Sequence, residues 1–307
     1  MAALCGGVGA ARFLRGLVDV VDAGRVVAVV NTGDDVVLHG LHVSPDLDTV
    51  TYTLAGAISR ERGWGLEGET WAAMEALGRY PSSLSWFNLG DRDLATHLFR
   101  TQRLREGASL SVVTAEIAAA WGVPVRVLPM SDDPVETVMD VEGEGEIGFQ
   151  DYFVRLRHSV AVRGVGFRGV ETARPAPGVL DAVAAADAVV ICPSNPIVSI
   201  GPVLAVPGVR EAVAARRETV VAVSPIVAGA ALKGPADRLL GELGHEVSVV
   251  GVAGLYAPVA ATLVVDEADA ALASAVEAEG MRCIVAPTVM HGALEAAALA
   301  RVVVEVA

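Results

Sequence analysis

The chain has 307 residues, of which 53% are hydrophobic and only 5% aromatic, and its formal net charge is −14. This length can bury a substantial core in one large domain, and an interior of Ala, Val and Leu is typical of helices packed on parallel strands. The acidic balance argues against a nucleic-acid-binding surface or a polybasic membrane anchor, so an anionic ligand would need local arginines, backbone N–H groups or a metal.

The cysteines and the long apolar runs indicate a cytoplasmic protein. Cys5, Cys192 and Cys283 are far apart in apolar stretches, which is typical of reduced, buried thiols rather than of a disulfide framework. Glycines interrupt the only N-terminal apolar run, so we expect no signal peptide. Two longer uncharged runs, 188–209 and 247–265, are broken by prolines and glycines, which indicates buried strands with loops rather than membrane spans.

The N-terminus carries a candidate phosphate-binding segment. The apolar run 2–5 precedes Gly6-Gly-Val-Gly-Ala-Ala-Arg12, and a helical pattern follows. A strand, a glycine loop and a helix in this order point backbone N–H groups at a phosphate, so Gly6, Gly7 and Gly9 are candidate anion ligands. Arg12, in the first helical turn, strengthens this interpretation. The spacing is not the full G-x-G-x-x-G pattern, and a glycine turn without a ligand is the alternative.

A cluster of acids follows the second predicted strand, 26–30. That strand delivers the sequence Asn-Thr-Gly-Asp-Asp at 31–35 to the edge of the sheet where open α/β folds bind ligands. Four carboxylates lie within fifteen residues. They are Asp34, Asp35, Asp46 and Asp48. Such a cluster is costly unless a positive group lies in it, and Mg²⁺ prefers oxygen ligands. A helix start at 44–45 leaves N-capping as the alternative role for Asp46 or Asp48.

Half of the fourteen aromatic residues lie between 52 and 99. Trp64, Trp71 and Trp86 are candidates to flank a flat ligand, although an aromatic-rich helical core is an equal alternative. The sequence Leu-Gly-Asp-Arg-Asp-Leu at 89–94 mixes acids and a base. It is typical either of a phosphate or metal clamp or of an ordinary surface ion-pair turn.

The second half of the chain predicts further strands and a second ligand position. Short alternating stretches with glycines predict a β-rich insertion or edge segment at about 135–175. A strand at 188–192 ends in the loop Pro193–Pro196, where Ser194 and Asn195 are candidate ligand contacts, although a proline-bounded turn with no ligand is the alternative. The remaining predicted strands are 125–129, 219–223, 247–250, 262–265 and 284–287. We therefore predict a single α/β domain over 1–307, with a Rossmann-like, mostly parallel sheet flanked by helices and a smaller inserted subdomain.

Seven motifs run in order over most of the chain. They are Gly6–Phe13, Asn31–Asp35, Ser44–Thr49, Leu89–Asp93, Met130–Pro134, Pro193–Pro196 and Ser224-Pro225. Together they resemble the CofD/FbiA family, the phospholactate or phosphoenolpyruvate transferases of deazaflavin coenzyme (F-420) biosynthesis. The resemblance implies transfer of a phospholactyl or phosphoenolpyruvyl group from a guanosine-diphosphate-activated donor to the terminal hydroxyl of the deazaflavin FO, with release of GMP. It also implies dependence on magnesium and a homodimer.

The resemblance assigns roles to several candidate residues. Asp48 matches a deazaflavin-contacting acid of the family, and Asn88 falls at a further deazaflavin position. The glycine loop, with Ser194 and Asn195, matches the parts that receive the donor nucleotide. Trp64, Trp71 and Trp86 are candidates to flank the deazaflavin ring.

The chemistry of the acids agrees with such a transfer. An acid cluster can hold Mg²⁺, and a remaining carboxylate can orient or deprotonate the attacking hydroxyl. We expect Asp46 and Asp48 to act as metal ligands or as the base, with Asp34 and Asp35 in support. A non-catalytic nucleotide-sugar-binding regulator of the YvcK type is the alternative. It would keep the glycine loop but does not need the acids of 44–49 together with those of 89–93.

Overall fold

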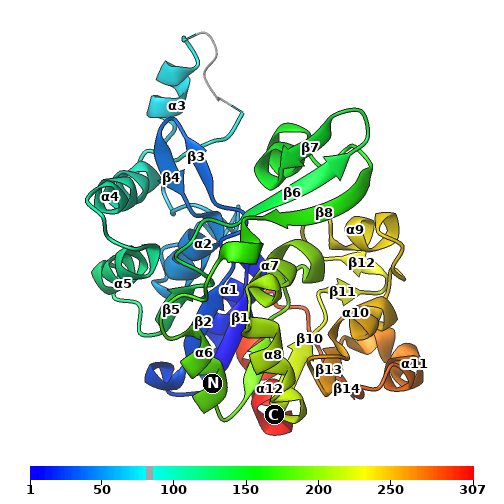
Figure 1. Ribbon diagram of the computed structural model, residues 1–307. Coiled ribbons are helices and arrows are strands. Elements are labelled where there is room, and N and C mark those ends of the chain that lie inside the picture. The colour runs from blue at the N-terminus through cyan, green and yellow to red at the C-terminus, as the bar shows by residue number, and fades with distance from the viewer. Residues whose placement is uncertain (81–85) are drawn as a thin grey trace.

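A seven-stranded parallel sheet forms the centre of the protein (Figure 1). The computed structural model describes residues 1–80 and 86–307. Along the sheet the strand order is β14-β13-β10-β9-β1-β2-β5, and every neighbouring pair is parallel. The strands are β1 (Ala2–Cys5), β2 (Val27–Val30), β5 (Arg126–Pro129), β9 (Val189–Ile191), β10 (Val220–Val223), β13 (Thr262–Val265) and β14 (Arg282–Val285).

Helices cover both faces of this sheet because its central strands are apolar on both sides. In β1, β9, β10 and β13 every residue is buried, as expected for strands with helices above and below. On one face pack α1 (Gly7–Leu17), α2 (Pro45–Leu54), α5 (Leu110–Ala120) and α12 (Ala293–Val306). On the other pack α6 (Val179–Ala185), α7 (Gly201–Ala205), α8 (Val209–Ala214), α9 (Ala236–Glu242), α10 (Val249–Tyr256) and α11 (Ala273–Ala278). The predicted α/β class is confirmed.

The order of the strands changes direction between β1 and β9. From β1 the chain moves outward to β2 and β5, and it then returns to place β9 on the other side of β1. In open α/β sheets the loops leaving the carboxyl ends of two such strands diverge and leave a crevice for a ligand. The residues after Cys5 and after Ile191 therefore border the expected binding position.

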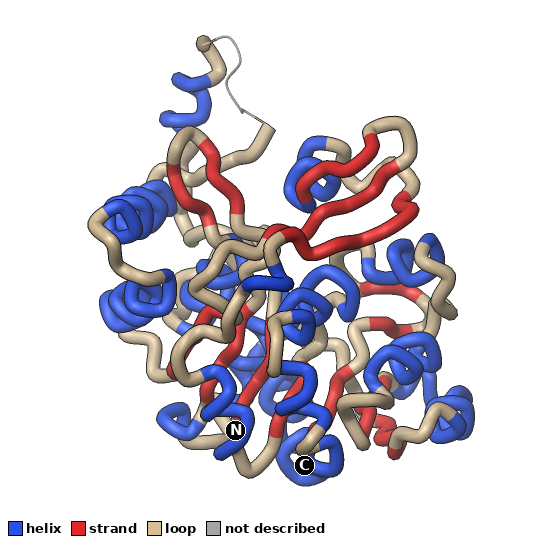
Figure 2. The backbone as a smooth tube through the Cα atoms, in the orientation of Figure 1, coloured by secondary structure: helices blue, strands red, loops and turns tan. Residues whose placement is uncertain are grey.

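Two smaller units lie beyond the carboxyl ends of the strands, on either side of the central line (Figures 1 and 2). The first has its own apolar core and combines the hairpin β3 (Val36–Leu38) and β4 (Leu41–Val43) with α3 (Ala72–Leu77) and α4 (Asp93–Arg105). The second is an antiparallel sheet in the order β7-β6-β8, built from β6 (Glu136–Val141), β7 (Gly145–Gly148) and β8 (Val162–Arg168). The three strands of this sheet fall within the segment 135–175.

The remaining elements are short. A two-stranded ladder pairs β11 (Ile226–Val227) with β12 (Ala230–Ala231). The π-helical turns are Asp151–Arg155 and Pro196–Ile200, and the 3₁₀ turns are Ala23–Arg25, Val170–Thr172, Arg217–Thr219 and Glu267–Leu272. Within the described part of the chain, no helix combines the length and the apolar character that crossing a membrane requires.

One predicted strand is wrong. Residues 247–250 lead into the helix α10, and the Ser248 hydroxyl caps that helix by accepting hydrogen bonds from the N–H groups of Val250 (3.0 Å) and Gly251 (3.4 Å). A short, uniformly apolar run is compatible with a buried strand or with a buried helix, so periodicity could not separate them here. Each of the other predicted strands overlaps a strand of the central sheet.

We predict that Gly16→Ala destabilises the fold although alanine is the better helix former. A Cβ at Gly16 would lie 2.2 Å from the carbonyl carbon of Ala296, where α1 crosses α12. Overpacking of this kind costs roughly 1–3 kcal/mol of unfolding free energy. The matched control is Gly254→Ala on the exposed side of α10, which should stabilise by about 0.5–1 kcal/mol. Urea unfolding measures both, and an unchanged Gly16→Ala midpoint would contradict the close crossing.

Candidate active site

A cavity of about 710 Å³ opens over the carboxyl ends of the central strands. Its walls come from the loops that follow β1, β2, β9, β10 and β14 and from both smaller units. The volume lies within the usual range for small-molecule and cofactor sites, about 300–1,000 Å³. The residues expected at the switch of strand order therefore meet in one space with side chains from distant parts of the chain.

The glycine segment lets three pieces of backbone approach one another. A Cβ at Gly6 would lie 2.6 Å from Oδ2 of Asp46, and one at Gly9 would lie 2.2 Å from the carbonyl oxygen of Pro193. Gly7, the first residue of α1, has a φ of 71°, which favours glycine. The helix thus begins inside the glycine segment, and its N-terminus, which carries a partial positive charge, faces the cavity.

Ser194 and Asn195 line the cavity, but their side chains are used to hold the backbone. The Ser194 hydroxyl donates to the carbonyl of Gly6 (2.8 Å) and accepts from the Gly6 N–H (3.3 Å). Oδ1 of Asn195 accepts from the N–H groups of Ile197 (2.9 Å) and Val198 (3.3 Å). These contacts join the loop after β9 to the start of α1 and so shape the predicted donor side of the cavity.

Asp34 and Asp46 are buried carboxylates that line the cavity. Asp46 accepts a hydrogen bond from Nδ2 of Asn31 (3.0 Å), yet burial raises the pKa of Asp46 to about 6. Burial, together with the charge of Asp46, raises the pKa of Asp34 well above its usual range, and Oδ1 of Asp34 has no hydrogen-bond partner among residues 1–80 and 86–307. Ionisation of either acid therefore lowers the folding stability of the protein.

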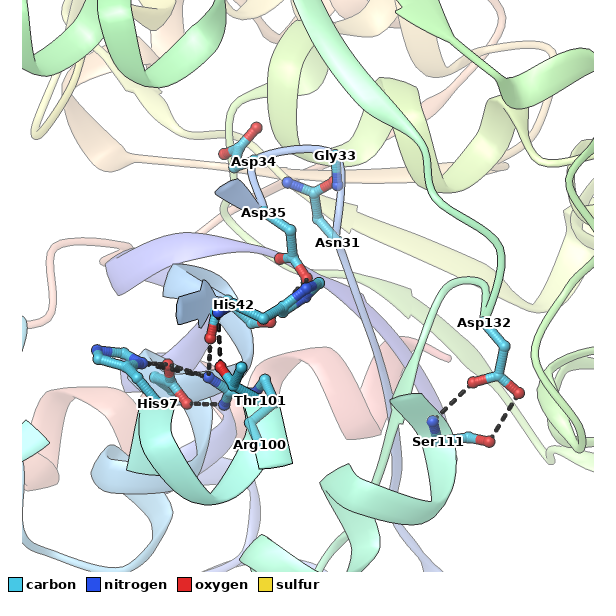
Figure 3. A network of polar contacts seen from close by, with 12 residues as sticks. Asn31, Gly33, Asp34, Asp35, His42, His97, Arg100, Thr101, Ser111 and Asp132 are labelled. Carbon is cyan, nitrogen blue, oxygen red and sulfur yellow. Dashed lines mark hydrogen bonds and ion pairs between the residues drawn. The ribbon is translucent and has the colours of Figure 1, made fainter. Parts of the chain in front are cut away.

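Asp35 has a different role from its neighbour. Figure 3 shows that Asp34 and Asp35 point to different sides of their loop. Asp35 accepts from the Ser44 hydroxyl (2.7 Å) and contacts Nε2 of His42 (2.9 Å), so it joins the hairpin β3–β4 to the start of α2. It does not line the cavity, whereas the other three acids of the predicted cluster do.

A buried network surrounds Asp48, which lies in the first turn of α2. Arg100, from α4, pairs with both carboxylate oxygens of Asp48, and its Nη1 lies 3.1 Å from Oδ2. Burial raises the pKa of Asp48, although Arg100 and His97 oppose this effect. The Tyr52 hydroxyl donates a hydrogen bond to Asp93 (2.5 Å). Burial alone would raise the pKa of Asp93, but the contacts with His97 and Tyr52 outweigh burial, so the pKa of Asp93 is lowered.

Tyr52 and Arg100 were not among the site residues predicted from the sequence, and no sequence pattern connected His97 with Asp48. Arg100 is 1% exposed, so it is a structural counter-ion rather than a surface charge. A usable signal exists in the spacing 93, 97 and 100, which places an acid, an imidazole and a guanidinium on one face of a helix. That spacing indicates that the three side chains share one face of a helix. It does not indicate that Asp48 is their partner, because Asp48 is 52 residues from Arg100.

Two groups of side chains suit a divalent cation. Asp48, Asp93 and His97 each place a ligand atom within 4.8 Å of the others, and two carboxylates with an imidazole form a common donor set. A cation there would share Asp48 with the guanidinium of Arg100. Within the described residues no cation lies beside Asp34 or Asp46, and a positive ion would lower the raised pKa of both acids and occupy the unpartnered oxygen of Asp34. The first group therefore has the donor geometry for a metal, whereas the second has the greater electrostatic need for a positive charge.

Aromatic side chains form the outer wall. Trp64, Trp86 and Asn88 line the cavity, whereas Trp71 does not and packs edge-on against Trp64 with ring centroids 6.0 Å apart. The opposite wall contains aromatic residues that sequence analysis did not select. They are Phe149 and Phe153, whose rings stack at 5.4 Å. A flat, partly apolar ligand matches these walls.

Fold and site together define an α/β protein in which the N-terminus of one helix, buried acids and aromatic side chains face one cavity. The family described as "2-phospho-L-lactate transferase CofD" matches residues 1–294. The chain belongs to this family and is therefore a transferase.

The relatives agree with this assignment, and a solved structure shares the fold. The chain is 48% identical over 308 residues to a phosphoenolpyruvate transferase of Streptomyces griseus, covering 99% of this chain and 97% of the relative. It is 48% identical over 304 residues to one of Kitasatospora aureofaciens, covering 97% and 95%. A solved UPF0052 protein of Bacillus halodurans shares the fold with a TM-score of 0.62 at 16% identity, covering 99% of this chain and 97% of that one.

We predict that Arg100→Met lowers the unfolding free energy by about 3–5 kcal/mol, because it leaves the buried carboxylate of Asp48 without its counter-charge. Adding Asp48→Asn to that variant should restore part of the loss. The control is Arg15→Met, which removes an exposed pair with Asp19 and should cost less than about 1 kcal/mol. Urea unfolding gives all values, and equal effects of Arg100→Met and Arg15→Met would rule out a buried pair.

We also predict that Asp46→Asn stabilises the protein at high pH in EDTA. The pKa of Asp46 is about 6 in the fold against 3.8 in the unfolded chain, so its ionisation opposes folding above pH 3.8 and does so fully above about pH 6. The gain should be roughly 1–3 kcal/mol at pH 8 and should shrink as the pH is lowered towards 4. Urea unfolding at several pH values measures it.

Added Mg²⁺ provides the second arm of this measurement. A cation held by Asp34 and Asp46 should stabilise the unmodified protein at pH 8 more than it stabilises Asp46→Asn. Equal stabilisation of both proteins would place the cation elsewhere and would favour the group around His97.

Proposed function

We propose that this enzyme transfers a phospholactyl or phosphoenolpyruvyl group from a guanosine-diphosphate-activated donor to the terminal hydroxyl of the deazaflavin FO and releases GMP. The observation that carries the proposal is the cavity at the switch of strand order, where the N-terminus of α1, three buried acids and the aromatic walls face one space. Membership of the transferase family supports it. A cytoplasmic location and a homodimer stay predictions from sequence.

The donor side is supported by the glycine segment. Backbone N–H groups and the positive end of α1 favour a phosphate at Gly6, Gly7 and Gly9, with Arg12 further along the helix. The loop around Ser194 and Asn195 borders the same region. Its side chains hold the loop in place, so this chain would contact the donor there mainly through backbone groups.

The acceptor side is supported by Asp48 and the aromatic walls. Trp64, Trp86 and Asn88 line the part of the cavity that suits a deazaflavin ring. Asp48 lines the cavity and is held in place by Arg100, which supports a contact between its carboxylate and the acceptor. In the reaction the hydroxyl oxygen of FO bonds to the phosphorus that carries the three-carbon acid, and the bond from that phosphorus to the oxygen of GMP breaks. Asp48 is the proposed acceptor of the hydroxyl proton.

Asp34 and Asp46 are the residues proposed to hold Mg²⁺, with Asp35 behind them. Bound there, the ion would neutralise the diphosphate and the charge that develops on the departing GMP. The raised pKa of Asp46, about 6, matches a carboxylate that needs a nearby cation to stay ionised at neutral pH.

The proposal predicts saturable binding of FO, measured by its fluorescence with and without GDP and Mg²⁺. Trp86→Leu should weaken FO binding roughly tenfold because it removes a stacking surface from the cavity wall. Trp71→Leu is the comparison variant, since Trp71 lies outside the cavity lining and acts on the wall only through its packing against Trp64, and it should weaken FO binding much less than Trp86→Leu does. Turnover with each activated three-carbon acid would then identify the donor.

Two outcomes would count against the proposal. Absence of FO binding under every condition, combined with saturable binding of a nucleotide sugar, would favour a regulator of the YvcK type. FO binding that Trp71→Leu weakens as much as Trp86→Leu does would move the acceptor away from the proposed wall.

A further inference from the structure

Lys233 is the only lysine in a chain with 23 lysine and arginine residues. It lies between β12 and α9, where its exposed side chain lines the opening of the cavity. An ammonium group is a compact point charge on a flexible stem, whereas a guanidinium is a planar fork. The only lysine ammonium of the chain thus lines the cavity.

Two arginines line the cavity with Lys233, and the three cations come from separate parts of the chain. Arg12 lies on α1 and Arg62 in the segment after α2. Nζ of Lys233 lies 3.4 Å from the carbonyl oxygen of Arg62, which is 171 residues away. Partial burial, and then the charge of Arg12, lowers the pKa of Lys233. These three cavity-lining residues form a cationic cluster, in which Lys233 contacts the backbone carbonyl of Arg62 while the Arg62 guanidinium lies over the rings of Trp64 (5.5 Å to the centroid) and Trp71 (5.3 Å).

The cluster has no internal counter-charge. The hydrogen-bond partners of Arg12, Arg62 and Lys233 are carbonyl oxygens, and within the described ranges 1–80 and 86–307 no carboxylate lies within 4.0 Å of these cations. In the described part of the chain, Nε of Arg62 is buried without a hydrogen-bond partner, and the guanidinium contacts the rings of Trp64 and Trp71 rather than a carboxylate. In contrast, Arg103 on the outer surface pairs with two glutamates. Like charges facing one cavity in an acidic protein repel one another unless an anion lies among them.

We propose that Lys233, with Arg12 and Arg62, forms a second anion subsite of the donor, separate from the N-terminus of α1. The group that it takes has phosphate or carboxylate chemistry. This inference rests on the proposed function for the identity of the donor, which carries two phosphates and, on its three-carbon acid, a carboxylate. Arg12 lies five residues along α1 from Gly7, about 7.5 Å along the helix axis, so one phosphate at the helix terminus leaves a further anionic group for the cluster.

The absence of any other lysine makes a direct test possible. An amine-reactive reagent can label only Lys233 and the N-terminal amine of Met1, and Met1 lies at the opposite end of β1, where its amine donates to the carbonyl of Arg25. Inorganic pyrophosphate at ten times its Kd should slow labelling of Lys233 to about one tenth, because about one site in eleven is then free. Labelling of Met1 should not change. Mass spectrometry of the two peptides measures both rates.

Labelling in the presence of GDP, GMP or phosphoenolpyruvate then shows which part of the donor supplies the anionic group. Protection by GDP but not by GMP identifies the second phosphate as the ligand, and protection by phosphoenolpyruvate in the presence of GMP identifies the end that bears the three-carbon acid. Unchanged labelling of Lys233 while calorimetry shows GDP bound would overturn the subsite and leave the proposed transferase standing. Protection by pyrophosphate without any binding of FO would support the anion subsite and count against the proposed transfer to FO.

Variants give an independent measure of the same subsite. Lys233→Met should weaken pyrophosphate binding roughly tenfold in calorimetry, as expected for the loss of a charge-assisted contact. Arg301→Met removes one exposed cation from α12, outside the cavity lining, and should leave that affinity unchanged. Unchanged affinity in Lys233→Met would overturn the proposal. Circular dichroism of both variants excludes a loss of fold as the cause.

Discussion

The site depends on the close approach of the loops that follow β1 and β9. Only a hydrogen atom fits at Gly9, where a Cβ would lie 2.2 Å from the Pro193 carbonyl oxygen, and Gly6 lies as tightly against Asp46. The Ser194 hydroxyl joins the two loops through its bond to Gly6. Because of this packing, the N-terminus of α1 and the first turn of α2 face the same cavity.

Charge is distributed unevenly around that cavity. Buried acids, Asp34 and Asp46 among them, have raised pKa values, so their ionised forms oppose folding. Arg100 offsets this cost for Asp48 alone. The cluster around Lys233 adds positive charge without carboxylate partners. Buried charges without partners lower the stability of the free protein. They are typical of a binding site whose ligand supplies the opposite charges.

The central sheet positions the chemistry, and the two smaller units supply the walls. Trp86 comes from the unit around α4, while Phe149 and Phe153 come from the unit around β6. The Bacillus halodurans UPF0052 protein shares this fold at only 16% identity, and a fold by itself does not define an activity. The family assignment rests instead on the match over residues 1–294 and on relatives at 48% identity.

The α/β class, seven strands of the sheet and the edge of the sheet at which the cavity opens could be predicted from the sequence. These features depend on local signals, namely apolar runs ended by glycine, proline and polar residues. Tertiary contacts were needed to show that 247–250 leads into a helix, that Asp35 and Trp71 lie outside the cavity lining, that Arg100 pairs with Asp48, and that Lys233 reaches the backbone of Arg62. Such partners are separated by 52 and 171 residues, and no local pattern records which distant side chain will fill a given space or meet a given charge.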